Sequence, residues 1–449
     1  MEINIWDIIL SPFYLMVIFF ISRRTRNKNI ENNPGYRYYL PGLWLKIICG
    51  ISLSLIYIYY FKGGDTISYF YDTKTLGNVL FENPREFFKL MLNGTNNNFY
   101  YSIGTKVITF EFGKDAYSFF FVRLITPITF LAFQNALITV ILLAWISYIG
   151  VWKLYSLFCE VFPKLYKELS YAIVFVPSLA LWGSGILKDT VTTTACFLFV
   201  FYFYRLFIKK PFSFKYFLYL ILCGFVLISI KPYIIIALIP ACLIWFSVVW
   251  TRNIENVFLR VISTPTIIVF GITIAIFILS LLGSSLGKYA SKESILKKAQ
   301  ETQQDLINAE SYSENYFDIG KFDNTVPSVL SKAPAAITAG LFRPFIWEAR
   351  NPLMIASGIE SFCILLLSIV VLFFVGPIKI IRNLFKEPII FFSLVFAIIF
   401  AFSVGLTTAN FGALVRYRIP AIPFYICFLI VILSNNIRER NSSKMGYSK

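Results

Sequence analysis

The sequence predicts an all-α polytopic membrane protein, and three observations carry that prediction. Of 449 residues, 57% are hydrophobic, 18% are aromatic and only 14% are charged, with a mean hydropathy of +0.70. Soluble domains carry about 25% charged residues, so a water-soluble globule is a poor match. Long apolar runs recur along the chain, and basic residues gather in the connections between them. Aromatic-rich runs without alternation at period two exclude a transmembrane β-barrel.

Eleven apolar stretches are candidate membrane spans, since a helix needs about 20 mostly apolar residues to cross about 30 Å of hydrocarbon. The first lacks a basic leader and a small-residue cleavage site, so we interpret it as a retained helix. The stretches, several of them short or interrupted, are 6–22, 43–61, 124–150, 168–182, 189–208, 214–230, 233–250, 261–283, 354–375, 387–406 and 418–434.

The net charge of +17 is concentrated on one side of these spans. Six connections hold 22 Lys and Arg against 6 Asp and Glu, and such a bias marks the cytoplasmic side. The other side is nearly balanced, so a nucleic acid is not an expected partner. The sequence thus predicts a bacterial inner-membrane protein with its N-terminus outside and its C-terminus in the cytoplasm. The six connections are 23–46, 151–169, 205–215, 251–260, 376–387 and 438–449.

Residues 1–449 are predicted to form a single membrane domain with two larger outer loops. In the first loop, 62–123, apolar residues of 80–92 recur at helical spacing between charges, which is typical of an amphipathic helix in the membrane interface. The second loop, 284–353, carries eight acidic and eight basic residues. Its polar part predicts a solvated lid or a surface helix.

The sequence also limits the chemistry. Histidine is absent, so a general base is expected to be a carboxylate, or else a Tyr or Lys. No metal-binding or nucleotide-binding motif occurs, no cofactor is implied, and the need for a divalent cation is left open. The seven cysteines lie in or beside apolar runs without CxxC spacing and are expected to be small core residues, not disulfides or zinc ligands: Cys49, Cys159, Cys196, Cys223, Cys242, Cys363 and Cys427.

Asp65 is the predicted catalytic base. It follows Gly63 and Gly64, which allow the chain to end a helix and turn back over its membrane exit. If the next residues are helical, Asp65, Tyr69 and Asp72 share one face. A carboxylate at the edge of the membrane can take a proton from a hydroxyl. The alternative is that Asp65 only caps a helix.

Six basic residues next to the outer membrane ends are candidates for binding an anion. Arginine offers a planar fork suited to phosphate oxygens, and two arginines in the VRYR stretch can flank one anion. The alternative is that these side chains extend from the membrane to its polar interface, with Tyr417 as an interfacial aromatic residue. The six are Lys188, Lys231, Arg343, Arg350, Arg416 and Arg418.

The remaining acidic residues on the predicted outer side have several interpretations. Asp189 begins an apolar helix, where it suits the positive end of the helix dipole and can pair with Lys188, or it can have a functional role. Trp347 and Glu348 lie near this face. Glu360 lies within an apolar stretch, where an ionisable residue is a functional candidate by default.

Three stretches of the sequence resemble the C-type polytopic glycosyltransferases (GT-C), the superfamily that includes protein mannosyltransferases and bacterial lipid A sugar transferases. They are GGDTISY, FGKDAYSFFFVRLITPITFLAFQNALITVILLAW and VPSLALWGSGILKDTVTTTACFLFVFYFYRL, which together span about residues 60–208. The family often carries an acid pair in its first loop, whereas here Asp65 stands alone and Asp72 follows seven residues later.

The resemblance implies a polyprenyl-phosphate-linked sugar as donor and a glycan, lipid or protein as acceptor, with transfer on the extracytoplasmic face. Asp65 matches the family's base. Arg343, Arg416, Arg418 and Lys231 would bind the donor phosphate. Acceptor-binding or supporting roles would fall to Asp72, Tyr69, Asp189, Lys188, Trp347 and Glu348.

Two other functions stay open. A Wzy-type polysaccharide polymerase or an O-antigen ligase would depend on the arginines more than on one carboxylate. A transporter or flippase would place its ionisable groups near the bilayer midplane and would show internal repeats. No repeat is visible in the sequence, and the charged groups gather at one face.

Overall fold

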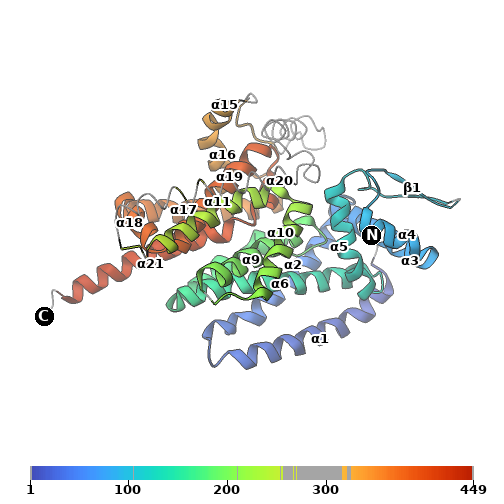
Figure 1. Cartoon of the computed structure of the whole chain (residues 1–449), viewed down its shortest axis with the longest axis horizontal. Coiled ribbons are helices and arrows are strands. Elements are labelled where there is room, and N and C mark those ends of the chain that lie inside the picture. The colour runs from blue at the N-terminus through green and yellow to red at the C-terminus, as the bar shows by residue number, and fades with distance from the viewer. Residues whose placement is uncertain are drawn as a thin grey trace. The chain divides into compact units, whose positions relative to one another are not determined.

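The computed structural model is dominated by α-helices (Figure 1). It describes residues 3–104, 106–209, 211–252, 254–255, 266, 269, 316–320 and 325–446. Within these residues there is one two-stranded antiparallel sheet, a hairpin that pairs Tyr100 with Thr109 and Ile103 with Lys106. The predicted all-α class is therefore confirmed, with this short hairpin as an addition.

Eight helices in the described residues are long and apolar enough to cross a membrane, so the chain is a polytopic integral membrane protein. Each of the eight overlaps one of the eleven predicted stretches. They are Ile5–Asn29, Pro34–Phe61, Ala136–Val161, Lys188–Ile208, Pro232–Thr251, Pro352–Val375, Pro388–Thr407 and Ile422–Asn441.

The other predicted stretches turn out differently. The stretch 168–182 is divided between two short helices, and 214–230 forms an apolar helix that is slightly too short for the same criterion. Most of 261–283 lies outside the described residues. The predicted long helix 124–150 is broken, because Phe133 and Gln134 adopt left-handed backbone angles and the Asn135 side chain binds the carbonyls of Ala132 and Phe133.

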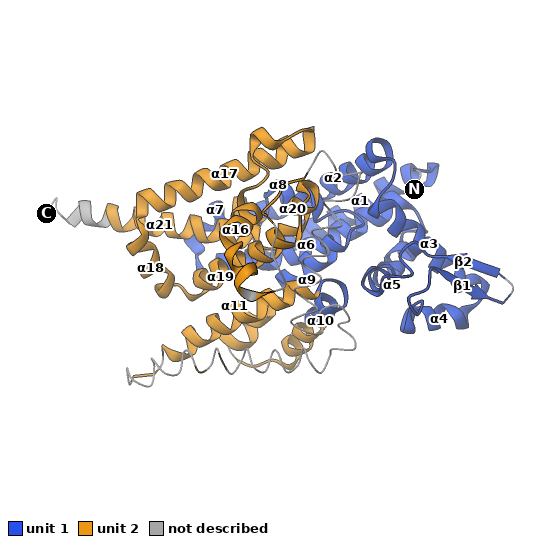
Figure 2. Cartoon of the chain, turned by 90° about the horizontal axis from the view of Figure 1, so that it is seen from above, with its two compact units in different colours: residues 1–170, 174–198, 223–231 blue, residues 171–173, 199–222, 232–449 orange. Residues whose placement is uncertain are grey.

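The chain divides into two compact units, coloured separately in Figure 2. Unit 1 comprises residues 1–170, 174–198 and 223–231. Its elements are α1 Ile5–Asn29, η1 Pro34–Tyr38, α2 Tyr39–Leu55, η2 Ile56–Phe61, α3 Asp65–Glu82, α4 Pro84–Asn93, β1 Tyr100–Ile103, β2 Lys106–Thr109, α5 Ala116–Leu131, α6 Ala136–Val161, η3 Pro163–Leu165, most of α7 Tyr166–Ile173, α8 Pro177–Trp182, the start of α9 Lys188–Phe203 and the end of α10 Phe214–Ile230.

Unit 2 comprises residues 171–173, 199–222 and 232–449. Besides the remaining parts of α7, α9 and α10, its elements are η4 Tyr204–Ile208, α11 Pro232–Thr251, α15 Val326–Ser331, α16 Ala333–Phe342, η7 Ile346–Glu348, α17 Pro352–Val375, α18 Pro377–Lys386, α19 Pro388–Thr407, α20 Phe411–Arg418 and α21 Ile422–Gly446. The prediction of a single domain stays a prediction.

Small residues let the helices of each unit approach closely. In unit 1, a Cβ on Gly150 of α6 would lie 2.9 Å from the backbone of Thr194 on α9. In unit 2, a Cβ on Gly405 of α19 would lie 2.0 Å from the carbonyl oxygen of Ala336 on α16. Close backbone contact at small residues is the usual packing mode of membrane helices, because lipid provides no hydrophobic force that drives helices together.

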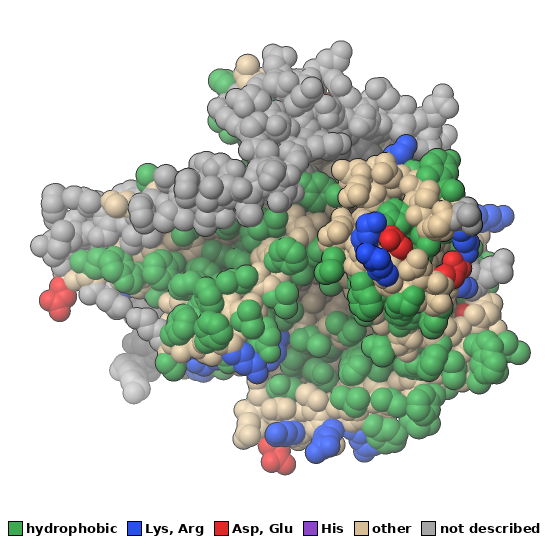
Figure 3. Space-filling view, turned by 45° about the vertical axis from the view of Figure 1, so that its right-hand side comes forward, with side chains coloured by type: hydrophobic (Ala, Val, Ile, Leu, Met, Phe, Trp, Pro, Cys, Tyr) green, Lys and Arg blue, Asp and Glu red, His purple; other side chains and the backbone are tan. Residues whose placement is uncertain are grey.

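The outer surface of several helices is apolar. Phe13 of α1 is 63% exposed and Phe373 of α17 is 82% exposed. Figure 3 shows broad areas of hydrophobic side chains on the face it presents. Such faces fit contact with lipid. Five of the seven cysteines are buried as predicted, whereas Cys49 is half-buried and Cys363 is exposed on α17 and so does not belong to the core.

The predicted cytoplasmic connections contact one another within each unit. In unit 1, Arg37 lies over the ring of Tyr166 with its Cζ atom 5.6 Å from the ring centroid. In unit 2, Arg252 donates hydrogen bonds to the carbonyls of Phe385 and Lys386, both at 2.6 Å, and Lys386 forms an ion pair with Glu439. Segments grouped by their charge alone are therefore neighbours in space.

The predicted outer segments likewise contact one another. In unit 1, Lys188 donates a hydrogen bond to Ser118 of the first outer loop. The next residue, Asp189, accepts a hydrogen bond from Lys231. In unit 2, the amide of Phe317 donates to the carbonyl of Ala409, which links the second loop to the segment that leads into α20. The grouping agrees with the positive-inside analysis except at Lys46, which ends the predicted cytoplasmic connection 23–46 but donates to Gly183, just before Lys188 on the predicted outer side. Which group faces the cytoplasm stays a prediction.

Candidate functional site

The Gly-Gly turn directs the chain from the second span into α3. The span ends in η2, Lys62 adopts a left-handed conformation, and Gly64 has a φ of 96°, which favours glycine. Gly64 is the N-cap residue, and Asp65 is the first residue of α3. The residues after Asp65 are helical, which is the condition under which Asp65, Tyr69 and Asp72 share one face. Asp65 is half-buried and lies in the first turn, where a carboxylate is stabilised by the helix dipole.

Tyr69 and Asp72 are buried on α3 and hold the end of the first outer loop. The two carboxylate oxygens of Asp72 accept hydrogen bonds from the amides of Glu111 and Phe112, each at 2.9 Å. Burial raises the pKa of Asp72 to about 6, although these two hydrogen bonds act in the opposite direction. The Tyr69 ring stacks on Phe112 with centroids 4.1 Å apart. These contacts fix the loop against α3.

Ser118 is the centre of a hydrogen-bonded network beside Tyr69. Its hydroxyl accepts hydrogen bonds from the Tyr69 hydroxyl at 3.3 Å and from the Lys188 ammonium at 2.8 Å. It donates to the carboxylate of Asp115, the N-cap residue of α5. The Nζ atom of Lys188 also lies 3.7 Å from a carboxylate oxygen of Asp115, and the Lys188 side chain is about 19% exposed. The network therefore joins α3, α5 and α9 and has access to solvent.

Asp189 and Lys231 form a buried ion pair next to this network. The Asp189 side chain is 2% exposed and that of Lys231 is 7% exposed. Asp189 occupies the first turn of α9, and Lys231 follows the last residue of α10. A buried pair of this kind is costly to break, because removal of one partner leaves an uncompensated charge. The pair therefore fixes the start of α9 against the end of α10.

A buried, non-helical turn at residues 183–187 separates α8 from α9. Irregular backbone at membrane depth is tolerated where protein surrounds it, and here α2 covers the turn, with Gly50 against Ser184 and Leu53 against Gly185. The ammonium of Lys46 on α2 donates to the carbonyl of Gly183, the residue that ends α8. Lys46 is 4% exposed and was not a predicted site residue.

A small cavity of about 10 Å³ lies beside Lys46. Its walls include Gly42, Tyr148, Val174 and Leu179. The Lys46 ammonium has three hydrogen-bond donors, one of which binds the Gly183 carbonyl. A cavity of this size is at the lower limit for one water molecule, which could accept a second hydrogen bond. Lys46 thus supports the turn that precedes Lys188 and Asp189.

Arg343 belongs to unit 2 and lies among aromatic rings. Its Cζ atom is 5.2 Å from the centroid of Phe317 and 5.8 Å from that of Phe345. Its Nε atom is 3.5 Å from Glu348, and the Arg343 side chain is 26% exposed. Glu348 also accepts a hydrogen bond from the amide of Phe345, while Trp347 is exposed and stacks on the Phe345 ring. Arg343 is therefore held in place while part of it contacts solvent.

Arg418 is almost completely buried, and its guanidinium binds uncharged acceptors. It donates to the carbonyls of Leu341, at 3.3 Å, and Arg343, at 2.5 Å, and to the hydroxyl of Ser361, at 2.7 Å. The carboxylate of Glu360 stabilises its charge electrostatically. These bonds satisfy carbonyls at the C-terminal end of α16, where a cation is favourable. Arg418 thereby fixes the backbone of Arg343.

Arg416 lies on the same short helix, α20, and is half-buried, with its Cζ atom 5.6 Å from the centroid of the Tyr417 ring. Arg350 is exposed. Unit 2 thus carries Arg343 and Arg416 as partly accessible cations. Their alternative role, in which they extend to the polar interface of the membrane, stays open.

The predicted site residues fall into two sets. Asp65, Tyr69, Asp72, Lys188, Asp189 and Lys231 belong to unit 1, whereas Arg343, Trp347, Glu348, Arg416 and Arg418 belong to unit 2. Within unit 1, Tyr69 and Lys188 meet at Ser118, and Asp189 meets Lys231. Within unit 2, Arg343 meets Glu348, and Arg418 binds the Arg343 carbonyl. The prediction that both sets line one pocket stays a prediction.

Sequence reasoning missed Asp115, Ser118, Lys46 and Ser361. Asp115 precedes an apolar run with Ser118 three residues later, a spacing typical of a helix N-terminus that could have drawn attention to it. Lys46 carried a signal too, because a lysine inside an apolar run is a functional candidate. Ser361 carried none, since its role depends on a contact with a residue 57 positions away.

Within the described residues, no three Asp, Glu or Cys side chains are grouped as a metal site. The arrangement offers a half-buried carboxylate at a helix start, a solvent-accessible lysine in a hydrogen-bonded network and two partly accessible arginines. Such groups can accept a proton and stabilise an anion.

The fold and these sites define an α-helical, polytopic integral membrane protein with polar clusters near the ends of its spans. Comparisons with protein-family models, with curated proteins and with solved structures found no match. The fold therefore establishes this class of protein, and no family is assigned.

Proposed function

We propose that the protein is a membrane glycosyltransferase of the GT-C type, which transfers a sugar from a polyprenyl-phosphate-linked donor to an acceptor hydroxyl on the extracytoplasmic face. The observation that carries the proposal is the position of Asp65. It is a half-buried carboxylate directly after a membrane span, on the helix whose Tyr69 contacts the Ser118 and Lys188 network.

The proposed reaction is a single displacement. The acceptor oxygen forms a bond to the anomeric carbon of the sugar, and the bond from that carbon to the phosphate oxygen breaks. The acceptor proton passes to the carboxylate of Asp65, and the electron pair of the broken bond leaves on the polyprenyl phosphate. The anomeric configuration is inverted. A general base of this kind contributes about 10²- to 10⁴-fold to a rate.

The cations have separate roles in this proposal. Arg343 and Arg416 are partly accessible, and they stabilise the negative charge that develops on the departing phosphate. Arg418 and Lys231 bind protein groups, so we assign them positioning roles, Arg418 for the Arg343 backbone and Lys231 for the start of α9. The remaining predicted residues support acceptor binding or hold the helices of the site in place. They are Lys188, Asp189, Tyr69, Asp72, Trp347 and Glu348.

The test uses the full chain in lipid vesicles with a panel of polyprenyl-phosphate-linked hexoses and pentoses that carry a radiolabelled sugar. Host membrane lipids and glycans serve as acceptors. We expect labelled product and released polyprenyl phosphate, with the rate lowered about 100-fold or more in Asp65→Asn. The matched control is Glu82→Gln, an acid-to-amide change at an exposed position of the same helix, which should retain activity.

Two outcomes would replace the proposal. If Asp65→Asn keeps full activity while Arg343→Gln or Arg416→Gln loses it, the polymerase or ligase is the better description. If the sugar accumulates inside the vesicles and no covalent product forms, the protein is a transporter or flippase.

A further inference from the structure

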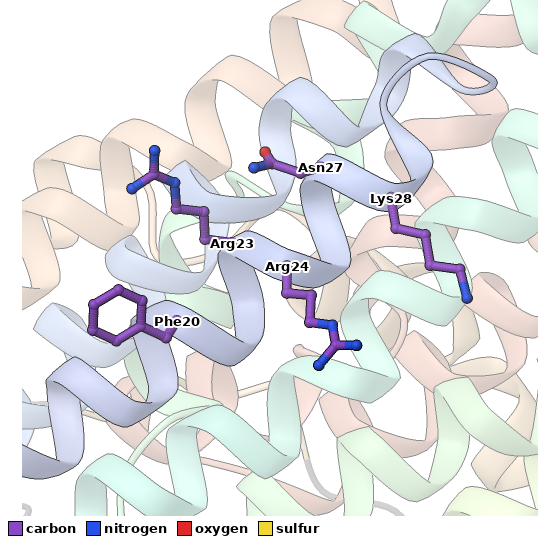
Figure 4. Close-up of a pocket in the computed structure, with 5 residues that line it drawn as sticks. All are labelled: Phe20, Arg23, Arg24, Asn27 and Lys28. Carbon is purple, nitrogen blue, oxygen red and sulfur yellow. The ribbon is translucent and has the colours of Figure 1, made fainter.

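The C-terminal end of α1 presents a group of basic side chains at the point where the first span ends. Arg23, Arg24, Arg26 and Lys28 lie within six residues, directly after an apolar run. An open hollow is lined by Phe20, Arg23, Arg24, Asn27 and Lys28. Figure 4 shows that Arg24 and Lys28 extend to one side of the helix, whereas Arg23 and Asn27 extend to the other. Because all five lining residues come from one helix, the hollow is an open surface and not an enclosed cavity.

No acidic side chain of the described residues forms an ion pair with these cations. The contacts of this group are with uncharged atoms: Arg26 donates to the Asn27 side chain at 3.1 Å, and the Cζ atom of Arg23 lies 5.8 Å from the Phe19 ring centroid. Arg23, Arg24 and Lys28 are exposed. Four positive charges therefore meet solvent or lipid without compensation from this part of the protein.

An apolar stripe leads along α1 to these cations. Phe13, Val17 and Phe20 are exposed, and with Arg24 and Lys28 they follow helical spacing that places all five on one face. In Figure 4, Arg24 and Lys28 extend to the same side of the helix. From Phe13 to Arg24 the helix rises about 16 Å, roughly half the thickness of the hydrocarbon core. The stripe thus matches one leaflet in length.

We infer that this face of α1 binds an anionic phospholipid. The headgroup phosphate lies against Arg24 and Lys28, and an acyl chain follows Phe20, Val17 and Phe13 toward the middle of the bilayer. Charge complementarity selects the anionic headgroup, and the stripe selects a lipid over a soluble phosphate. A basic group at the end of a span contributes about a factor of five in affinity for each Lys or Arg near a negatively charged surface.

The test uses native mass spectrometry of the purified full chain in detergent micelles that contain phosphatidylglycerol. It measures how much of this lipid stays bound to the protein after the micelle is removed. We expect wild type to retain phosphatidylglycerol and the double variant Arg24→Gln/Lys28→Gln to lose about 30-fold in apparent affinity. The control Lys164→Gln/Lys167→Gln removes the same charge from exposed positions of the 151–169 connection and should retain it. Single variants Arg24→Gln and Lys28→Gln, each expected to lose about fivefold, serve if the double variant is not obtained folded.

Three results would overturn the inference. One is equal retention of phosphatidylcholine and phosphatidylglycerol by wild type. A second is the same loss in the control as in the α1 variant, which would indicate a general effect of charge. The third is displacement of the lipid by millimolar inorganic phosphate, which would indicate a site for a soluble anion.

Discussion

The polar clusters of the two units satisfy their buried charges in different ways. In unit 1, the Lys231 ammonium pairs with the Asp189 carboxylate, and Lys188 lies beside Asp115. In unit 2, the Arg418 guanidinium is bonded to two carbonyls and a hydroxyl, with Glu360 as an electrostatic neighbour. The ion pair cancels the buried charge of Lys231. Uncharged acceptors orient the guanidinium without cancelling its charge.

The proposed reaction uses the two units for opposite tasks. In unit 1, the half-buried carboxylate of Asp65 is suited to accept a proton. In unit 2, the partly accessible Arg343 and Arg416 are suited to stabilise phosphate oxygens, and Arg418 fixes the backbone of Arg343. The predicted base, Asp65, belongs to unit 1, and of the four predicted phosphate-binding residues only Lys231 belongs to unit 1 as well. Three predictions test how each unit holds its buried charges, ordered by the expected effect on stability.

The largest effect is expected for the buried ion pair of unit 1. Removal of one partner, in Lys231→Met, should lower the free energy of unfolding by about 3–5 kcal/mol, because Asp189 is left as an uncompensated buried charge. The double variant Asp189→Leu/Lys231→Met should recover most of that loss. The measurement is unfolding by dodecyl sulfate in mixed micelles, followed by tryptophan fluorescence. A single variant as stable as wild type would contradict the role of the pair.

A loss of about 3 kcal/mol is expected for Arg418→Met in unit 2, because the carbonyls of Leu341 and Arg343 lose a charged donor while the cost of burying that charge is removed as well. Arg418→Lys should recover only part of it, because an ammonium cannot reproduce the planar fork that binds Leu341, Arg343 and Ser361 together. The exposed Arg350→Lys is the control and should stay within about 0.5 kcal/mol of wild type. Full recovery by Arg418→Lys would show that charge alone matters here.

The smallest effect is a pH dependence that belongs to unit 1. Burial raises the pKa of Asp72 to about 6, from an unfolded value near 4. The folded state therefore binds the proton more tightly, and the contribution of Asp72 to stability falls as the pH rises from about 4 to about 6, by about 2 kcal/mol. In Asp72→Asn this fall should disappear, whereas in Arg418→Met it should persist. Unfolding curves at pH 4.5, 5.5 and 7 give the comparison, and a slope that survives in Asp72→Asn would assign it to another group.

Sequence reasoning was most successful where one local pattern decides the structure. All eight membrane helices were anticipated, because apolar length is a property of the local sequence. The turn before Asp65 was anticipated too, since the left-handed angle at Gly64 favours glycine. Local patterns failed at Phe133 and Gln134, where two non-glycine residues adopt left-handed angles and divide an apolar run. The Asn135 side chain, which stabilises that break, accepts a hydrogen bond from Asn4 at 2.8 Å.

The site was predicted less completely than the helices. The residue types and their side of the membrane could be inferred from charge, and the contacts within each unit group the segments accordingly. The partners could not be inferred, because Lys231 and Asp189 are 42 positions apart and Lys46 and Gly183 are 137 apart. Only packing of α2 against the turn after α8 reveals why a lysine is buried there.

The amino-acid order alone determined the class of this protein, a chain of apolar membrane helices, because hydrophobic length acts locally in a bilayer. The tertiary structure decided which charges are paired and which stay accessible. The physical reason is that the cost of burying a charge depends on the atoms around it, and those atoms come from distant parts of the chain.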